Sequence, residues 1–209
     1  MRTACIAAMC LLSSAVAQAQ PTQIRVRGFA DIGSTTFNAG ESFAAVLGRD
    51  VGAVFGGGGD AVFPQRVFVS VRASRFRRTG ERVFLFERER FGLGIPTTVT
   101  VTPLELTGGY RFDYGWRVVP YAGGGIGSHH YTETSQFAGG GEDVARPFLG
   151  YHLMVGYEIR IARWIGTAAE AQWATVPDAL GADANSAARE FDESNLGGTT
   201  VRVKLIIGR

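Results

Sequence analysis

Apolar and polar residues alternate along most of this chain with a period of two. The pattern is clearest over residues 146–161, where one set of alternate positions is apolar throughout: Pro147, Leu149, Tyr151, Leu153, Val155, Tyr157, Ile159 and Ile161. The positions between them include Arg146, His152, Glu158 and Arg160. Because successive side chains of a β-strand point to opposite faces, the segment predicts a strand with one wholly apolar face. Soluble strands are usually about 5–6 residues long, and the greater length here is typical of a tilted strand that crosses a bilayer.

Seven further segments carry the same alternation, or a glycine-rich form of it, and bring the number of predicted strands to eight. These segments are residues 24–32, 51–62, 67–74, 104–112, 116–132, 164–176 and 200–207. An even number of antiparallel strands closes into a barrel with both ends of the chain on one side.

The connections between the predicted strands alternate in length. Three are short, at residues 63–66, 113–116 and 162–163, and four are long, at residues 34–50, 78–96, 133–145 and 177–195. Short periplasmic turns and longer outer loops are typical of outer-membrane barrels. The sequence therefore predicts an all-β fold, an eight-stranded antiparallel up-and-down transmembrane β-barrel. Within the long connections, residues 42–47 are predicted as a helical turn and residues 82–86 as an extension of a hairpin above the membrane.

The first twenty residues have the three regions of a secretory signal peptide. Arg2 supplies the positive start, residues 4–12 form an apolar run, and Ala17, Gln18 and Ala19 supply the small-residue cleavage site. The apolar run is too short for a membrane-spanning helix, which takes about 20 residues. We predict cleavage between Ala19 and Gln20, which makes residues 1–19 the signal peptide and residues 20–209 an outer-membrane β-barrel domain.

Composition and charge narrow the chemistry of the mature chain. Both cysteines, Cys5 and Cys10, lie in the predicted leader, so the mature chain has no thiol for disulfides, zinc–thiolate sites or nucleophilic catalysis. The formal net charge of +2 falls to +1 when Arg2 is removed, which argues against a nucleic-acid partner. The 29 glycines and 14 phenylalanines suit closely spaced strands with aromatic rings at the membrane interfaces.

The alternation places charges of both signs on the inner face of the predicted barrel. The predicted lumen charge network consists of Arg25, Arg27, Asp31, Asp60, Arg72, Glu105, Arg111, Glu158, Arg160, Glu170, Arg202 and Lys204. An eight-stranded barrel is just wide enough for side chains to fill it, and an unpaired buried charge is costly. We therefore expect opposite charges to pair and to plug the lumen, rather than to line a conducting pore.

Aromatic residues gather near all three short turns. They are Phe63, Phe112, Tyr114, Trp116 and Trp164. Rings at the level of the lipid headgroups form the girdles of membrane barrels, so we expect these side chains to mark one interface.

The sequence offers no catalytic or metal-binding constellation. His129 and His130 are neighbours on one predicted strand and point to opposite faces, as do Ser128 and His129, so neither pair can act jointly on one substrate. We expect no catalytic residues, no metal site, no cofactor and no enzymatic activity.

Residues 119–127 read Val-Pro-Tyr-Ala-Gly-Gly-Gly-Ile-Gly, which resembles the Pro-Tyr-x-Gly-x-Gly-x-Gly strand of small outer-membrane β-barrel proteins. Residues 150–161, 166–173 and 196–208 are similar to the strands that follow it in that family. The chain thus resembles the OmpA/OmpX/OmpW-like group of barrel domains over essentially its whole mature length. The resemblance implies insertion by the outer-membrane assembly machinery. The chain departs from the family in ending Ile206-Ile207-Gly208-Arg209, where an aromatic residue is usual.

These observations favour a monomeric structural or surface-interaction barrel of the bacterial outer membrane. Its partners would be membrane lipid and lipopolysaccharide, with long loops facing the host or environment. One alternative, implied by the OmpW-like branch, is a narrow transporter of small apolar molecules; a lateral opening, or an apolar lumen patch near Phe29, Phe68 and Met154, would favour it. A second alternative is a soluble secreted ligand-binding barrel, which requires a polar outside and an apolar interior.

Overall fold

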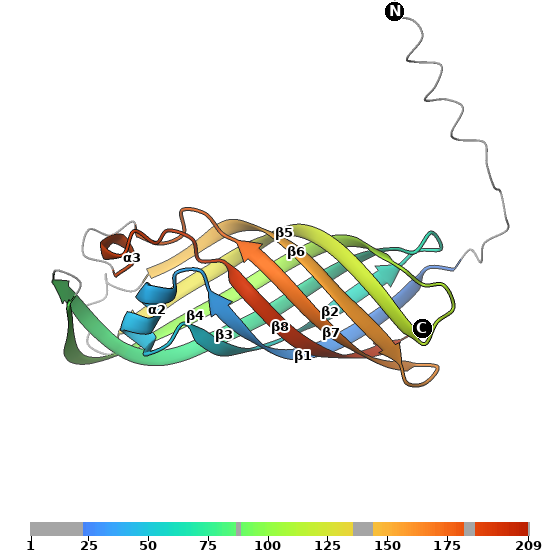
Figure 1. The fold of residues 1–209 in the computed structure, drawn as a ribbon, viewed down its shortest axis with the longest axis horizontal. Coiled ribbons are helices and arrows are strands. Elements are labelled where there is room, and N and C mark those ends of the chain that lie inside the picture. Colours follow the sequence, from blue (N-terminus) through green and yellow to red (C-terminus); the bar gives the residue numbers. More distant parts are fainter. Residues whose placement is uncertain (1–22, 87–88, 136–143, 182–186, 209) are drawn as a thin grey trace, which may run out of the picture.

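The structure, a computed structural model, describes residues 23–86, 89–135, 144–181 and 187–208. Its eight strands form a closed antiparallel barrel in which each strand pairs with its neighbours in the chain and β1 pairs with β8 (Figure 1). The strands are β1 (Arg25–Phe37), β2 (Val51–Val62), β3 (Val67–Phe86), β4 (Glu89–Arg111), β5 (Val118–Ser135), β6 (Val144–Arg160), β7 (Ile165–Thr175) and β8 (Gly198–Gly208). The predicted fold class is confirmed. The predicted cleavage site at Ala19 and Gln20 lies outside the described residues.

Three of the predicted long connections are partly wrong, and in one of them, residues 133–145, β5 continues to Ser135 and β6 begins at Val144. Strand β1 continues to Phe37, and most of the predicted loop 78–96 belongs to a long hairpin in which Arg78 pairs with Val99 and Phe84 with Phe91. The extension over residues 82–86 is therefore confirmed, and the hairpin projects past the other strands (Figure 1). The period-two alternation fades in this part, where residues 83–86 are all apolar, while the β-branched and aromatic side chains still favour strand.

Two helices of the described chain lie at the long-loop end of the barrel, α2 (Gly40–Leu47) and α3 (Ala187–Glu190) (Figure 1). The prediction of a helical turn at 42–47 is confirmed by α2. This helix ends at Gly48, which has a left-handed φ of 77° and donates its N–H to the Ala44 carbonyl. Among the described residues, no helix has the length and apolar character needed to cross a membrane.

The outer wall of the barrel is apolar. Leu149, Leu153, Val155 and Val203 are all exposed on it, with 68% of Leu153 accessible. Of the five predicted girdle residues, Phe112, Tyr114, Trp116 and Trp164 are exposed near the short turns, and Phe63 is half-buried. Because the oily side chains point outward and the charges inward, the second alternative, a soluble ligand-binding barrel, is wrong.

Candidate functional site

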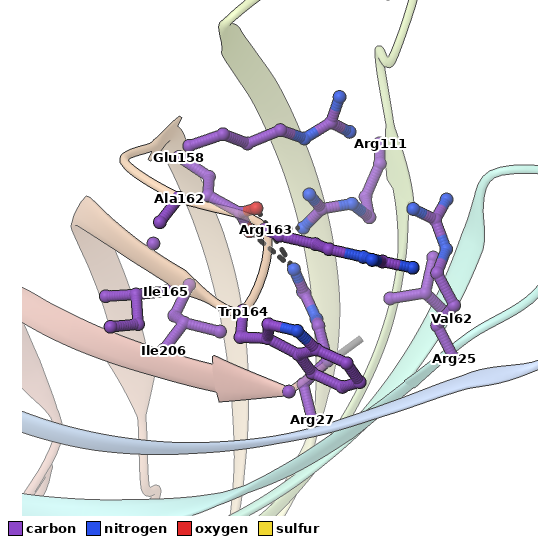
Figure 2. A pocket seen from close by; sticks show the side chains of 13 residues that line it. Arg25, Arg27, Val62, Arg111, Glu158, Ala162, Arg163, Trp164, Ile165 and Ile206 are labelled. Carbon is purple, nitrogen blue, oxygen red and sulfur yellow. Dashed lines mark hydrogen bonds and ion pairs between the residues drawn. The ribbon is translucent and has the colours of Figure 1, made fainter.

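The barrel interior is filled in layers, and the layer nearest the short turns is ionic. We call it the turn-side cluster: Arg27, Asp60, Arg111 and Glu158. Arg27 crosses the lumen from β1, with its Nε 2.8 Å from Asp60 Oδ1 and its Nη1 2.8 Å from Glu158 Oε2 (Figure 2). Arg111 Nη1 lies 2.9 Å from the same Glu158 oxygen. Four strands are thereby joined through two cations and two carboxylates.

A second ionic layer lies deeper in the barrel. This central cluster consists of Asp31, Arg72, Glu105, Glu170, Arg202 and Lys204. Glu170 is its hub, with Arg72 Nη2 at 2.8 Å, Arg202 Nε at 3.8 Å and Lys204 Nζ in direct contact. Arg72 Nε also approaches Asp31 Oδ2 at 3.4 Å, and its Nη1 approaches Glu105 Oε2 at 3.8 Å. The six charges are balanced and nearly fully buried.

Neutral side chains complete the central cluster. Gln172 accepts a hydrogen bond from Arg72 Nη1 at 3.1 Å and donates one to Glu105 Oε1 at 2.6 Å. Thr107 Oγ1 and His152 Nε2 are 2.8 Å apart, and His152 Nδ1 lies 3.9 Å from the Glu105 Oε1 that Gln172 binds. These contacts link strands β3, β4, β6 and β7 around the buried carboxylates.

An apolar layer separates the two ionic clusters. It consists of Phe29, Val62, Phe68, Tyr121, Met154, Ala168 and Ile206, all of them buried. Tyr121 connects this layer to the central cluster by donating its hydroxyl to Glu170 Oε2 at 3.1 Å. Lys204 Nζ lies 4.8 Å from the centre of the Phe29 ring, a cation–π distance. Phe29 and Tyr121 therefore lie against the ions, and Tyr121 packs edge-on against Phe68 with ring centres 6.0 Å apart.

The long-loop end is covered by a third layer, which we call the outer cap. Its buried members are Phe37, Ala39, Phe43, Leu47, Phe76, Val99, Val101, Val176, Ala179 and Leu196. Phe43 of α2 stacks on Phe37 with ring centres 4.0 Å apart, and Phe37 meets Phe76 edge-on at 4.9 Å. Helix α2 also contacts β3 backbone to backbone, since a Cβ at Gly80 would lie 2.0 Å from the Val46 carbonyl oxygen.

A carboxylate from the last long loop fastens α2 in place. Glu193 accepts hydrogen bonds from the N–H groups of Glu41 and Ser42, at 3.1 and 2.8 Å, and from Ser42 Oγ at 2.6 Å. These donors belong to the first turn of a helix, whose N–H groups have no partner within the helix. Residue Ala39 offers them no side-chain acceptor. Glu193 therefore joins two loops that are far apart in the sequence.

Small cavities remain at two levels of the lumen. One of about 90 Å³ lies near the short turns, where Arg25, Arg27, Arg163 and Trp164 line it (Figure 2). Another of about 50 Å³ lies beneath the outer cap and is lined in part by Ser74, Glu105, His129 and Arg202. The first borders the turn-side cluster and the second the central cluster, so the apolar layer lies between them.

The predicted charge network divides into the two clusters and a rim. Arg25 is exposed at the start of β1 and belongs to neither cluster, which corrects its assignment to the network. Arg160 pairs with Asp113 in the short turn after β4, instead of with a lumen carboxylate. Both are the last inward positions of their strands, where the side chain reaches past the barrel. Sequence reasoning missed Glu193, which lies in a loop without periodicity, and gave no role to the neutral Gln172.

The neighbouring histidines His129 and His130 do not form a joint site. His129 is buried in the lumen and His130 faces outward, so the prediction of opposite faces is confirmed. Over the described parts of the chain, no group of three or more His, Cys, Asp or Glu side chains is arranged to hold a metal ion.

A closed barrel with an apolar wall and an ionic interior defines an outer-membrane β-barrel protein. Residues 3–204 match the family model described as the outer membrane protein beta-barrel domain, and the chain belongs to this family. No curated protein sequence gives a significant match. The protein is placed in the bacterial outer membrane by its family and fold.

Solved structures of outer-membrane proteins have the same fold. Neisserial surface protein A is 12% identical, with a TM-score of 0.53 over 89% of this chain and 97% of that one. A major outer membrane protein from Thermus thermophilus is 8% identical, with a TM-score of 0.56 over 88% of this chain and 99% of that one. At such low identity, the likeness shows the fold alone.

Proposed function

We propose that this protein is a monomeric, non-enzymatic structural or surface-interaction barrel whose lumen does not conduct solutes. The observation that carries the proposal is the packing of four successive layers across the lumen: the turn-side cluster, the apolar layer, the central cluster and the outer cap. Ions would have to displace Arg72 from Glu170, which are 3% and 2% exposed. Breaking such a buried pair is costly, so the interior opposes permeation.

The outer end supplies a surface suited to contacts with other molecules. Helix α2 is held against the barrel by Phe43 and Glu193, and the β3–β4 hairpin projects beyond it. A rigid outer surface loses little conformational entropy on binding. One solved relative of the same fold is named a surface protein, which agrees with this role.

Planar-bilayer recording of the refolded protein tests the closed lumen. We expect no steady conductance from wild type, whose folded state is verified by the mobility of unboiled and boiled samples. The double variant Arg72→Ala/Glu170→Ala removes the buried pair that ions would have to displace and should produce brief openings. The matched variant Leu149→Ala/Leu153→Ala removes bulk from the lipid-facing wall and should stay silent. A steady single-channel conductance in wild type overturns the proposal.

Transport of small apolar molecules is the second candidate, and one observation favours it. Phe29, Phe68 and Met154 lie together in the apolar layer of the lumen. The wall is not paired continuously: β3–β4 pairing is interrupted between Ala73 and Phe76, opposite Pro103, which lacks an N–H, and the register shifts farther along the strand between Glu81 and Val83. Uptake of indole by proteoliposomes tests this candidate. Uptake faster in wild-type proteoliposomes than in protein-free vesicles, and slowed by Met154→Glu, would establish transport.

A further inference from the structure

The outward face of β3 changes character part-way along the strand. Nearest the short turns its outward residues are Val67, Val69 and Val71, each at least 40% exposed. Beyond Ala73, the next two outward residues are Arg75 and Arg77, both exposed. The row of lipid-facing side chains on this strand therefore ends in a pair of cations.

Neighbouring strands fix the level of this pair relative to the membrane. Ala73 pairs with Leu104, which is 56% exposed, and Arg75 pairs with Phe55, which is 58% exposed. Above Leu104, the outward positions of β4 are Thr102, Thr100 and Thr98. The apolar wall thus gives way to polar residues on both strands at one height. Since the long loops face outward, this height is that of the outer-leaflet headgroups.

Both guanidinium groups lack a counterion within the described chain. Neither Arg75 nor Arg77 has a hydrogen bond, ion pair or ring contact with any described residue, whereas the adjacent Arg78 donates to the Val51 carbonyl at 3.1 Å. The outward positions beside them on the described parts of β2 and β4 hold no carboxylate; they are Val51, Ala53, Thr98, Thr100 and Thr102. Two neighbouring cations are thereby left available to an external anion.

We propose that Arg75 and Arg77 bind a phosphate of the lipid A headgroup of lipopolysaccharide. Residues two apart on a strand are separated by about 6.6 Å, a spacing over which two long arginine side chains can converge on one phosphate. The planar guanidinium binds phosphate oxygens through paired hydrogen bonds. Phe55, beside Arg75 on the lipid side, is positioned to contact the acyl chains below the headgroup. The proposal rests on the outer-membrane location and is independent of whether the lumen conducts.

Lipid binding to the folded protein in detergent tests this proposal, with bound lipid counted by native mass spectrometry. The probes are lipid A with both phosphates, the same lipid without phosphates, and inorganic phosphate. The test variant is Arg75→Ala/Arg77→Ala. The control variant, Arg117→Ala/Arg163→Ala, removes the same charge from the short-turn end. All variants are first shown to be folded by their mobility without boiling.

We expect the test variant to bind lipid A about tenfold more weakly than wild type, as the loss of charge-assisted hydrogen bonds predicts, with the control unchanged. The phosphate-free lipid should bind wild type and the test variant equally. Equal lipid A affinity in wild type and the test variant overturns the proposal, as does equal weakening in the control. Displacement of lipid A by inorganic phosphate at equal concentration would assign the pair to a soluble anion and overturn the lipid site.

Discussion

The turn-side cluster and the central cluster balance their charges equally but hold them differently. In the turn-side cluster, two cations meet two carboxylates at 2.8–2.9 Å, and Arg27 and Asp60 keep about a tenth of their side-chain surface accessible. In the central cluster, three cations surround Glu170, and several of the charged pairs are 3.4–3.8 Å apart. The first is a set of direct bonds at the edge of the lumen. The second is a dense, buried group whose stability depends on its overall neutrality.

The largest effect should follow from neutralising the hub of the central cluster. Glu170→Gln leaves Arg72, Arg202 and Lys204 with two carboxylates, and we expect a loss of about 3–5 kcal/mol in the free energy of unfolding. Urea unfolding in lipid vesicles measures it, with the lipid-facing tryptophans as reporters. The double variant Glu170→Leu/Arg72→Leu restores neutrality and should cost less than the sum of its single changes. A loss below about 1 kcal/mol for Glu170→Gln would show that neutrality does not govern this cluster.

The equivalent change in the turn-side cluster should cost less. Glu158→Gln removes the carboxylate shared by Arg27 and Arg111, and we expect a loss of about 1–3 kcal/mol. The adjoining cavity of about 90 Å³ at the end of the barrel allows water to reach the released guanidinium groups. The same urea titration measures this loss. If Glu158→Gln proves as damaging as Glu170→Gln, the distinction between an accessible and a sealed cluster is wrong.

The two ends of the barrel also differ in how they are covered. At the long-loop end, the position of helix α2 depends on its hydrogen bonds to Glu193. Glu193→Ala leaves the N–H groups of Glu41 and Ser42 without their acceptor, which should cost about 1 kcal/mol of local stability in α2. Amide hydrogen exchange of α2 measures this opening, because the barrel strands should stay protected. Glu190→Ala removes an exposed carboxylate from α3 and serves as the control. Equal exchange of α2 in both variants would contradict the role of Glu193.

The sequence predicts the barrel wall better than it predicts the packing of its ends. Alternation places Leu153 outside and Glu170 inside because strand geometry forces successive side chains to opposite faces. The same rule wrongly assigns Arg25 and Arg160 to the lumen network. Alternation predicts which face a side chain points to, but it does not predict where along its length a strand leaves the barrel. It also cannot anticipate the bond from Glu193 to α2, which depends on how two irregular loops meet.

The contacts of neutral lumen residues are also not predictable from the sequence. Gln172 shares the inward parity of Glu170 yet carries no charge, so nothing in the pattern indicates that it connects Arg72 to Glu105. The outward direction of Arg75 and Arg77 is predictable from the alternation, since both continue the row of outward valines on β3. The predicted strand ends at residue 74, one residue before Arg75, so neither arginine is part of the predicted wall.

The smallest effect concerns the turn-side end, where Asp113, in the short turn after β4, pairs with Arg160 at the last position of β6. Burial alone would raise the pKa of the Asp113 carboxyl, but hydrogen bonds from Arg160 and the Gly115 N–H, with the charges of Arg160 and Arg111, hold its pKa below the usual value. A carboxyl with a lowered folded-state pKa stabilises the fold above its unfolded pKa of about 3.9, and this contribution is lost as pH falls through the folded value.

We therefore expect wild type to be slightly more stable than Asp113→Asn at neutral pH, with the difference vanishing in acid as Asp113 takes up a proton. Urea titrations across the acidic range measure this convergence. Asp192→Asn is the control, because Asp192 is an exposed carboxyl in a left-handed conformation that asparagine also tolerates. A difference between wild type and Asp113→Asn that stays constant with pH would mean that the contact with Arg160 does not depend on charge. The turn-side end would then be held by its hydrogen-bond geometry alone.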